Sequence, residues 1–272
     1  MGNRPVKSGW ITAKTADIND LYEQSVQCPE SEVDLILQAW KEIKGRLPTA
    51  IREDFCGTSA VAREWVRRDG LNTVLGIDLD GEVLCWAQNK INKELTQDQI
   101  GRIRLVKQDV MHVDADPVEC VLAMNFSYYG FKQRDQLKKY FSAVHKDLLN
   151  GGMFLLDAYG GSDSFLEMDE ERDLDGFTYV WDQHHVNPIT GHIVNYIHFE
   201  FPNGSKINRA FTYEWRFWSL PEIQDVLLES GFSDVSVYWE GTDEDGGGNG
   251  VWEIDKTGEA CAGWVAYIAA TK

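Results

Sequence analysis

The chain has 272 residues, which is long enough for one large α/β domain or for a core domain with an inserted cap. Its formal net charge of -18 argues against DNA or RNA as substrate, because nucleic-acid binding requires Lys and Arg to replace phosphate counterions. No run approaches the roughly 20 consecutive apolar residues of a membrane span, and residues 1–10 lack the apolar segment of a secretory signal. We therefore expect a soluble, cytoplasmic protein with no membrane or nucleic-acid partner.

Cysteine and histidine show no metal-binding pattern. The five cysteines are scattered without Cys-x-x-Cys spacing, and their odd number favours reduced thiols. Four histidines on predicted strands (His184, His185, His192 and His198) also lack a recognised ligand spacing, so we expect no metal. His185 and His198 remain minor candidates for a base, and no catalytic residue is assigned.

Residues 1–45 are predicted to form an N-terminal helical segment or lid, with a short helix near 21–26 and a second helix that starts at Ser31. Strands then alternate with helices. The expected strands cover 50–55, 73–78, 103–107, 118–124 and 153–157, and the expected helices cover 59–68, 82–93 and 134–149. This alternation is typical of a parallel sheet with helices on both faces.

The pattern changes at residue 160. Three β segments (177–185, 192–201 and 206–215) are joined by turn residues, which predicts an antiparallel cap over 160–218. A helix from 220 and strands at 235–239 and 264–270 complete a core made of 46–159 and 219–272. Residues 241–260, rich in glycine and acid, are expected to be a mobile loop. The prediction is an α/β fold with a Rossmann-like, seven-stranded, mostly parallel sheet and an inserted antiparallel β cap.

Three segments that follow consecutive strands carry residues suited to a nucleoside ligand. Residues 51–59 leave a strand and enter a helix through small residues, so their amides can approach a ligand at the positive end of the helix. Asp78 follows Gly57 by about twenty residues, the spacing of a carboxylate that binds ribose. Asp109 follows the third strand, where an acid can accept from an adenine amino group. Ordinary turns and helix capping are the alternatives, and Asp80 competes with Asp78.

The segment from Glu53 to Ser59 resembles motif I of class I S-adenosylmethionine-dependent methyltransferases, acid-x-Gly-x-Gly-x-Gly. Residues 125–128 resemble the motif that lines the methionine end of the cofactor, and 148–152 resemble the turn before the fifth strand. The resemblance implies S-adenosylmethionine as cofactor, bound by Tyr22, Glu53, Gly57, Asp78, Leu79, Asp109, Val110 and Asn125, with Tyr22 folding over it. Residues 52–58 and 238–245 resemble a bacterial subfamily of unknown substrate.

The sequence departs from motif I at two positions. Phe55 and Ser59 stand where the family has its first and third glycines, so only Gly57 can approach the cofactor without a side chain.

Aromatic residues are frequent in the predicted cap. Aromatic faces attract cations, and acidic residues lie nearby at 240 and 243–245, so an amine substrate is our hypothesis. The candidate substrate residues are Tyr128, Trp181, Trp215, Trp239 and Glu240. Packing of the cap and a solvated acidic turn are the alternatives. We expect methyl transfer to a nitrogen, or less readily an oxygen, of a small molecule.

Other functions remain open. An NAD-dependent oxidoreductase also uses a ribose carboxylate, but the G-x-G-x-x-G turn is absent. The alternatives kept are a non-catalytic S-adenosylmethionine-binding or protein-interaction module and a methyltransferase that modifies protein side chains.

Overall fold

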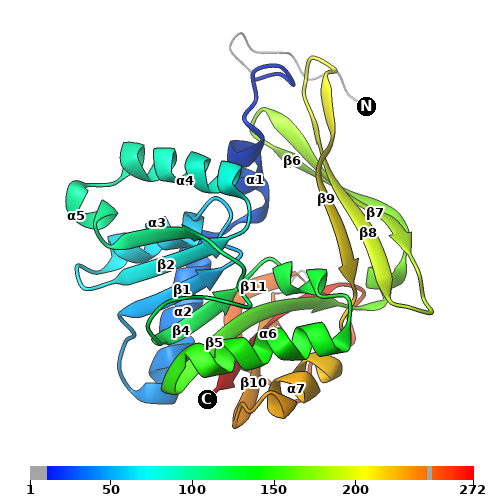
Figure 1. Cartoon of the computed structure of the whole chain (residues 1–272). Coiled ribbons are helices and arrows are strands. Elements are labelled where there is room, and N and C mark those ends of the chain that lie inside the picture. Colours follow the sequence, from blue (N-terminus) through cyan, green and yellow to red (C-terminus); the bar gives the residue numbers. More distant parts are fainter. Residues whose placement is uncertain (1–10, 244–246) are drawn as a thin grey trace.

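A computed structural model describes residues 11–243 and 247–272 (Figure 1). Its core sheet has eight strands in the order β11-β10-β12-β5-β4-β1-β2-β3. The strand bounds are β1 Ala50–Asp54, β2 Thr73–Asp78, β3 Ile103–Lys107, β4 Val118–Ala123, β5 Leu148–Gly160, β10 Asp234–Thr242, β11 Gly248–Ile254 and β12 Trp264–Thr271. Strands β1 to β5 are parallel to their neighbours among themselves, whereas β12 is antiparallel to β5 and to β10. The predicted α/β class with a mostly parallel sheet is confirmed.

Helices cover both faces of this sheet. The bounds are α1 Ile18–Val26, α2 Pro29–Lys44, α3 Ala60–Arg68, α4 Gly81–Glu94, α5 Gln97–Ile100, α6 Arg134–Asp147 and α7 Leu220–Glu229, with short 3-10 turns η1 Ser127–Gly130 and η2 Ser162–Phe165. Helices α6 and α7 share one apolar core with strands β4 and β5. Helices α2 and α3 bury their apolar stripes in a second core on the other face. The strands between these two layers are therefore buried on both sides, as parallel strands usually are.

The predicted number of seven core strands is wrong, because part of the expected 241–260 loop is a strand. Strand β11 pairs antiparallel with β10 and forms the edge of the sheet. Its side chains are mostly exposed, so the segment has no apolar alternation that would predict a strand.

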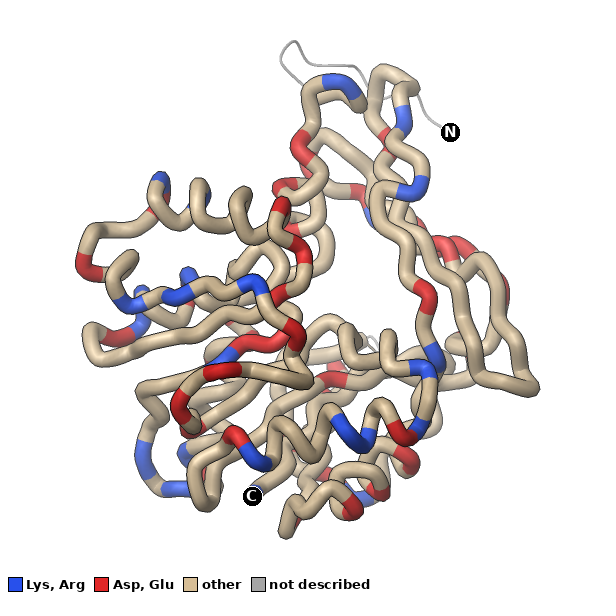
Figure 2. The backbone as a smooth tube through the Cα atoms, in the orientation of Figure 1, with Lys and Arg blue, Asp and Glu red and all other residues tan. Residues whose placement is uncertain are grey.

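The cap is a separate antiparallel sheet in the order β6-β7-β8-β9. Its strands are β6 Met168–Leu174, β7 Phe177–Val186, β8 His192–Glu200 and β9 Lys206–Arg216. The expected three strands are thus joined by a fourth. Strand β6 is exposed along most of its length and carries four acids, and such an edge strand lacks a buried face for sequence analysis to detect. Figure 2 shows acidic residues distributed over both the core and the cap.

Helix α1 lies between the core and the cap (Figure 1). On the cap side, Leu21 is 1% exposed and packs with Phe177, Ile197 and Phe199 in a third apolar cluster. No helix in the described part of the chain is long and apolar enough to cross a membrane.

The two-sided burial of β5 can be tested at Phe154, which has no exposed surface and packs in the α6–α7 core. We expect Phe154→Ala to lower the free energy of unfolding by about 3 to 5 kcal/mol, through lost burial and the cavity left behind. The measurement is urea unfolding followed by circular dichroism. Leu149→Ala is the control, because Leu149 is 46% exposed at the start of the same strand. Equal losses in the two variants would contradict this account of the core.

Candidate functional site

The loop between β1 and α3 has a left-handed backbone at each position where motif I has glycine. The φ angles are 57° at Phe55, 48° at Gly57 and 59° at Ser59. L-residues with a Cβ adopt this region at a cost, which explains why glycine is the usual residue there. The backbone path of the motif is therefore kept although two of its glycines are replaced.

This loop is tied to the end of β2. The Gly57 amide donates to Asp78 Oδ2 at 2.8 Å, and the Asp80 amide donates to Asp78 Oδ1 at 2.9 Å. Asp80 caps α4, because its Oδ1 accepts from the amides of Glu82 and Val83. The structure thus separates the two competing acids: Asp80 serves the helix, and Asp78 lies beside the motif I loop.

The residues after β2 and β3 differ in exposure. Leu79 is 64% exposed directly beside Asp78, while Val110 is only 4% exposed. The Asp109 side chain is half exposed, and its Oδ1 accepts from the Met111 amide at 2.9 Å. Asp109 therefore retains carboxylate surface for a further donor.

The segment after β4 is held by a buried acid at the end of β5. Asn125 and Phe126 both have positive φ, 56° and 57°, and their amides donate to the two oxygens of Asp157 at 2.7 and 2.9 Å. Burial raises the pKa of Asp157 to about 7, against the lowering effect of these two amides. Asp157 therefore fixes the turn that places Asn125 at this edge of the sheet.

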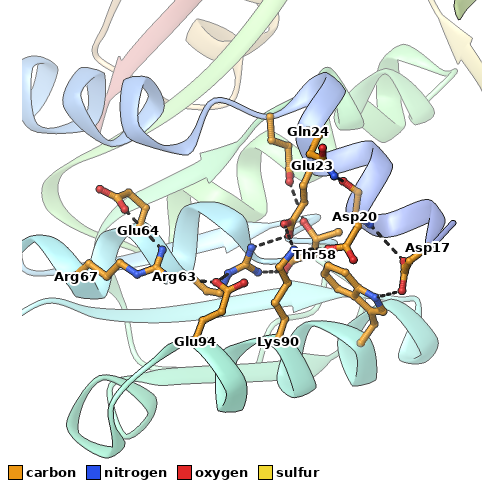
Figure 3. Close-up of polar contacts among 12 residues, drawn as sticks. Asp17, Asp20, Glu23, Gln24, Thr58, Arg63, Glu64, Arg67, Lys90 and Glu94 are labelled. Atoms are coloured by element: carbon orange, nitrogen blue, oxygen red, sulfur yellow. Dashed lines mark hydrogen bonds and ion pairs between the residues drawn. The ribbon is translucent and has the colours of Figure 1, made fainter. Parts of the chain in front are cut away.

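Helix α1 is fastened to the core by a charged network (Figure 3). Lys90 on α4 contacts Asp20 and Glu23 of α1, both at 2.6 Å. Arg63 on α3 reaches Glu23 at 2.7 Å. These contacts hold α1 across the helices that follow β1 and β2.

Tyr22 of α1 lies near the strand-end acids, although far from them in sequence. Its ring centroid is 4.9 Å from that of Phe211 in the cap. Burial raises the pKa of Tyr22 to about 12, with smaller contributions from Glu32, Asp157 and Asp78. Tyr22, which is predicted to fold over the cofactor, is thus affected by the charges of Asp78 and Asp157.

Two further acids are buried at this edge. Glu53 on β1 and Glu32 in the first turn of α2 are each 5% exposed, and each has one oxygen, Oε2, without a hydrogen-bond partner. Burial raises the pKa of Glu32 to about 7. Burial, and then the charge of Glu32, raise the pKa of Glu53 well above its usual value. Buried carboxylates with oxygens that lack a hydrogen-bond partner are suited to a positively charged ligand.

The cap brings aromatic side chains to the turn after β4. Trp181, Tyr213 and Trp215 form an aromatic cluster, in which the ring centroids of Trp181 and Trp215 are 6.2 Å apart and that of Tyr213 lies 5.9 and 4.5 Å from them. Trp215 also lies 6.4 Å from Phe126. Two of the predicted substrate residues therefore lie near Asn125.

Of the other three predicted substrate residues, Tyr128 is buried beside Asp157 and Tyr129, whereas Trp239 and Glu240 lie on strand β10. Tyr128 has no exposed surface, and its hydroxyl donates to the Asp157 carbonyl at 2.6 Å, so it forms part of the core. Trp239 packs on Trp264 at 5.1 Å and lines a cavity of about 660 Å³ with α7 and residues 254–260. Glu240 accepts from the Gly250 amide at 2.8 Å in the β10–β11 hairpin. None of these contacts joins them to the cap aromatics.

Part of the predicted acidic cluster lies outside the described residues, namely Glu244 and Asp245. Within the described ranges, no group of three or more His, Cys, Asp or Glu side chains is arranged to hold a metal ion.

Comparisons with known proteins agree on the architecture. No protein-family model matches the sequence, and neither does any curated protein. A solved S-adenosylmethionine-dependent methyltransferase from Clostridium acetobutylicum matches with a TM-score of 0.67 and 19% identity, over 93% of this chain and 96% of that one. The chain has the class I methyltransferase fold.

Two further structures with the methyltransferase fold align over nearly their whole length. The S-adenosylmethionine-bound amino pentose methyltransferase CalS10 from Micromonospora echinaspora has a TM-score of 0.65 and 13% identity, over 93% of this chain and 94% of its own. The sugar N-methyltransferase KedS8 from a Streptoalloteichus species has a TM-score of 0.63 and 14% identity, over 100% and 98%. The fold therefore includes the cap as well as the sheet.

Sequence analysis missed Glu32 and Asp157. Asp157 had a usable signal, because an acid at the carboxyl end of a parallel strand faces the ligand crevice of such folds. Glu32 adjoins the apolar stripe of α2, and a charge at a buried helical position is itself informative.

The replaced glycines can be tested at Ser59, whose hydroxyl is buried without a hydrogen-bond partner. We expect Ser59→Gly to be more stable than Ser59→Ala by about 1 to 2 kcal/mol, because only glycine avoids the cost of positive φ. Thermal and urea unfolding measure the difference. The same two substitutions at Ser25, inside α1, should give the opposite order, since glycine is the poorer helix residue. Equal stability of the Ser59 variants would show that the loop is not strained.

The burial of Glu32 predicts a pH dependence. Because its pKa is raised in the folded state, the native protein binds its proton more tightly, and its contribution to stability falls as pH rises from about 4.5 to about 7. We expect Glu32→Gln to gain stability relative to wild type across this window and to match it below the window. Urea unfolding at several pH values tests this. Glu30→Gln, an exposed site in the same turn, is the control, and a parallel shift in both variants would refute the prediction.

Proposed function

We propose that this protein is an S-adenosylmethionine-dependent methyltransferase that acts on a small molecule, with a nitrogen acceptor favoured over oxygen. The observation that carries the proposal is the joined pair of strand ends at β1 and β2. There the Gly57 amide and the Asp78 carboxylate are hydrogen-bonded to each other, with Asp109 at the end of the next strand. This is the arrangement that a nucleoside cofactor requires.

The strand order gives the direction of the bound cofactor. Because β3, β2, β1 and β4 are neighbours in that order, adenine would lie at Asp109 and Val110, and ribose at Asp78 with Leu79 beside it. The amino acid portion would then lie over β1 and β4, near Glu53 and Asn125. The unpartnered Glu53 Oε2 and the exposed Leu79 side chain both fit such a ligand. Tyr22 would cover it from α1.

The residues of the chain contribute placement and exclusion of water. When bound, the cofactor would supply a methyl group on a positively charged sulfur, so that an acceptor lone pair attacks the methyl carbon in line with the carbon–sulfur bond and the sulfur leaves. Asp157 holds the Asn125–Phe126 turn, and Phe126 contacts Trp215 of the cap, so apolar side chains lie beside the place where the acceptor would approach. Apolar side chains at such a place would help to keep water away from the reacting atoms.

An amine acceptor is supported by three independent features. Trp181 and Trp215 form part of an aromatic cluster near the turn, with Trp215 only 7% exposed, and aromatic faces attract cations. The chain is acidic overall, which attracts cationic substrates. Two proteins of the same fold are described as an amino pentose methyltransferase and a sugar N-methyltransferase. We propose an amine on a small polar molecule as the substrate class.

The first test is isothermal titration calorimetry with S-adenosylhomocysteine, with NAD as the control ligand. We expect Asp78→Ala to weaken binding by about tenfold or more, because it removes a charged acceptor together with its bond to the Gly57 amide. Asp80→Asn is the matched variant and should change affinity by less than about twofold, since Asn caps a helix as well as Asp. Binding of NAD in place of the homocysteine compound would overturn the proposal.

The second test is turnover of labelled S-adenosylmethionine with a panel of small amines and alcohols. Label transfer to an amine supports the full proposal. Binding without any transfer would favour the non-catalytic module, and transfer only to protein acceptors would favour a side-chain methyltransferase.

A further inference from the structure

The pair of buried acids has no role in the fold that accounts for both side chains. We infer that Glu32 joins Glu53 in a carboxylate pair that binds the ammonium group of the cofactor's amino acid portion and releases a proton on binding. This inference rests on the proposed function and adds a residue from α2 to the site.

The topology brings the two acids together. Helix α2 runs directly into β1 through a short connection and packs on the sheet face that includes α3, so its first turn lies at the carboxyl end of β1. Glu32 is in that first turn, and Glu53 lies near the end of β1. The charge of Glu32 raises the pKa of Glu53, and it also raises the pKa values of Tyr22, Asp157 and Tyr267. Glu32 is thus surrounded by the residues of the proposed methionine end.

Helix capping gives a hydrogen-bond partner to only one of the two carboxylate oxygens of Glu32. Its Oε1 accepts from the Cys28 amide at 3.4 Å, which is a long hydrogen bond. The other oxygen is buried and bare, and so is Oε2 of Glu53. Buried carboxylate oxygens are nearly always hydrogen-bonded, so two orphaned oxygens on facing acids indicate a missing donor.

No cation of the described residues neutralises this pair. Arg63 is the charged group that lowers the pKa of Glu53, yet it is already paired with Glu23 at 2.7 Å and Glu94 at 3.3 Å. The other titratable groups that act on the pair or respond to it (Cys56, Asp78, Asp157, Tyr22 and Tyr267) are a thiol, acids or phenols, and none is a cation. Without ligand the pair therefore retains a proton at neutral pH, because two unpaired charges cannot be buried side by side.

Binding of an ammonium group changes this balance. Its N–H groups donate to the two bare oxygens, and the carboxyl O–H bond breaks as its proton passes to the buffer. No other bond is made or broken. The affinity for a ligand with the ammonium group should consequently rise with pH through the neutral range.

The experiment compares two ligands by isothermal titration calorimetry in phosphate and in Tris buffer, whose ionisation enthalpies differ. S-adenosylhomocysteine carries the ammonium group, whereas methylthioadenosine keeps the nucleoside and the sulfur but lacks the amino acid. We expect proton release with the first ligand only. We also expect Glu32→Gln to weaken the binding of S-adenosylhomocysteine by about tenfold and to change the binding of methylthioadenosine by less than about twofold.

Glu30→Gln is the control variant, since Glu30 is exposed in the same turn. Equal proton release with both ligands, or unchanged binding of S-adenosylhomocysteine to Glu32→Gln, overturns the inference while the proposed function stands. If neither ligand binds wild-type protein, the proposed function itself fails. The comparison of the two ligands on wild type needs no variant, so the inference remains testable even if Glu32→Gln does not fold.

Discussion

The hydrogen bond from the Gly57 amide to Asp78 joins the motif I loop to the second strand, and the site depends on it. It holds a loop in which three residues have positive φ, two of them with side chains. The cost of that backbone at Phe55 is offset by packing, because its ring lies 5.6 Å from that of Tyr140 and 6.1 Å from that of Phe131. The backbone shape of the motif is thus retained although two of its three glycines are replaced.

The pleat of strand β1 directs its charged side chains to opposite faces of the sheet. Arg52 and Asp54 point to one face, where they pair with each other at 2.9 Å, with Asp147 at 2.8 Å and with the Tyr140 hydroxyl. Glu53 points to the opposite face, as alternate residues of a strand do. There it meets Glu32 and no free cation among the described residues. On one face the buried charges of Arg52 and Asp54 are of opposite sign and pair with each other, whereas on the other face Glu53 and Glu32 are both acids.

Much of the fold was predictable, because alternating strands and helices leave local patterns of apolar residues in the sequence. Acids that follow parallel strands were predictable as neighbours, because the carboxyl ends of such strands lie at the same edge of the sheet. That rule predicts Asp78 and Asp109 as cofactor-binding acids. Strands β6 and β11 were not predicted, because edge strands that bury neither face leave no apolar alternation in the sequence. The same limit applies to Trp239, whose neighbours depend on long-range packing. Glu32 and Asp157 become informative only when burial and unsatisfied oxygens are known.

The place of the cap follows from the strand order. Strand β5 lies beside β4, so an insertion that follows β5 begins next to the Asn125–Phe126 turn. In the proposed direction of the cofactor, from Asp109 toward β4, its amino acid and sulfur end would lie at the same turn. A cap inserted after β2 or β3 would cover ribose or adenine instead. Because this cap meets Phe126 through Trp215, the proposed substrate surface and the proposed methyl end would be brought together by the connectivity of the chain.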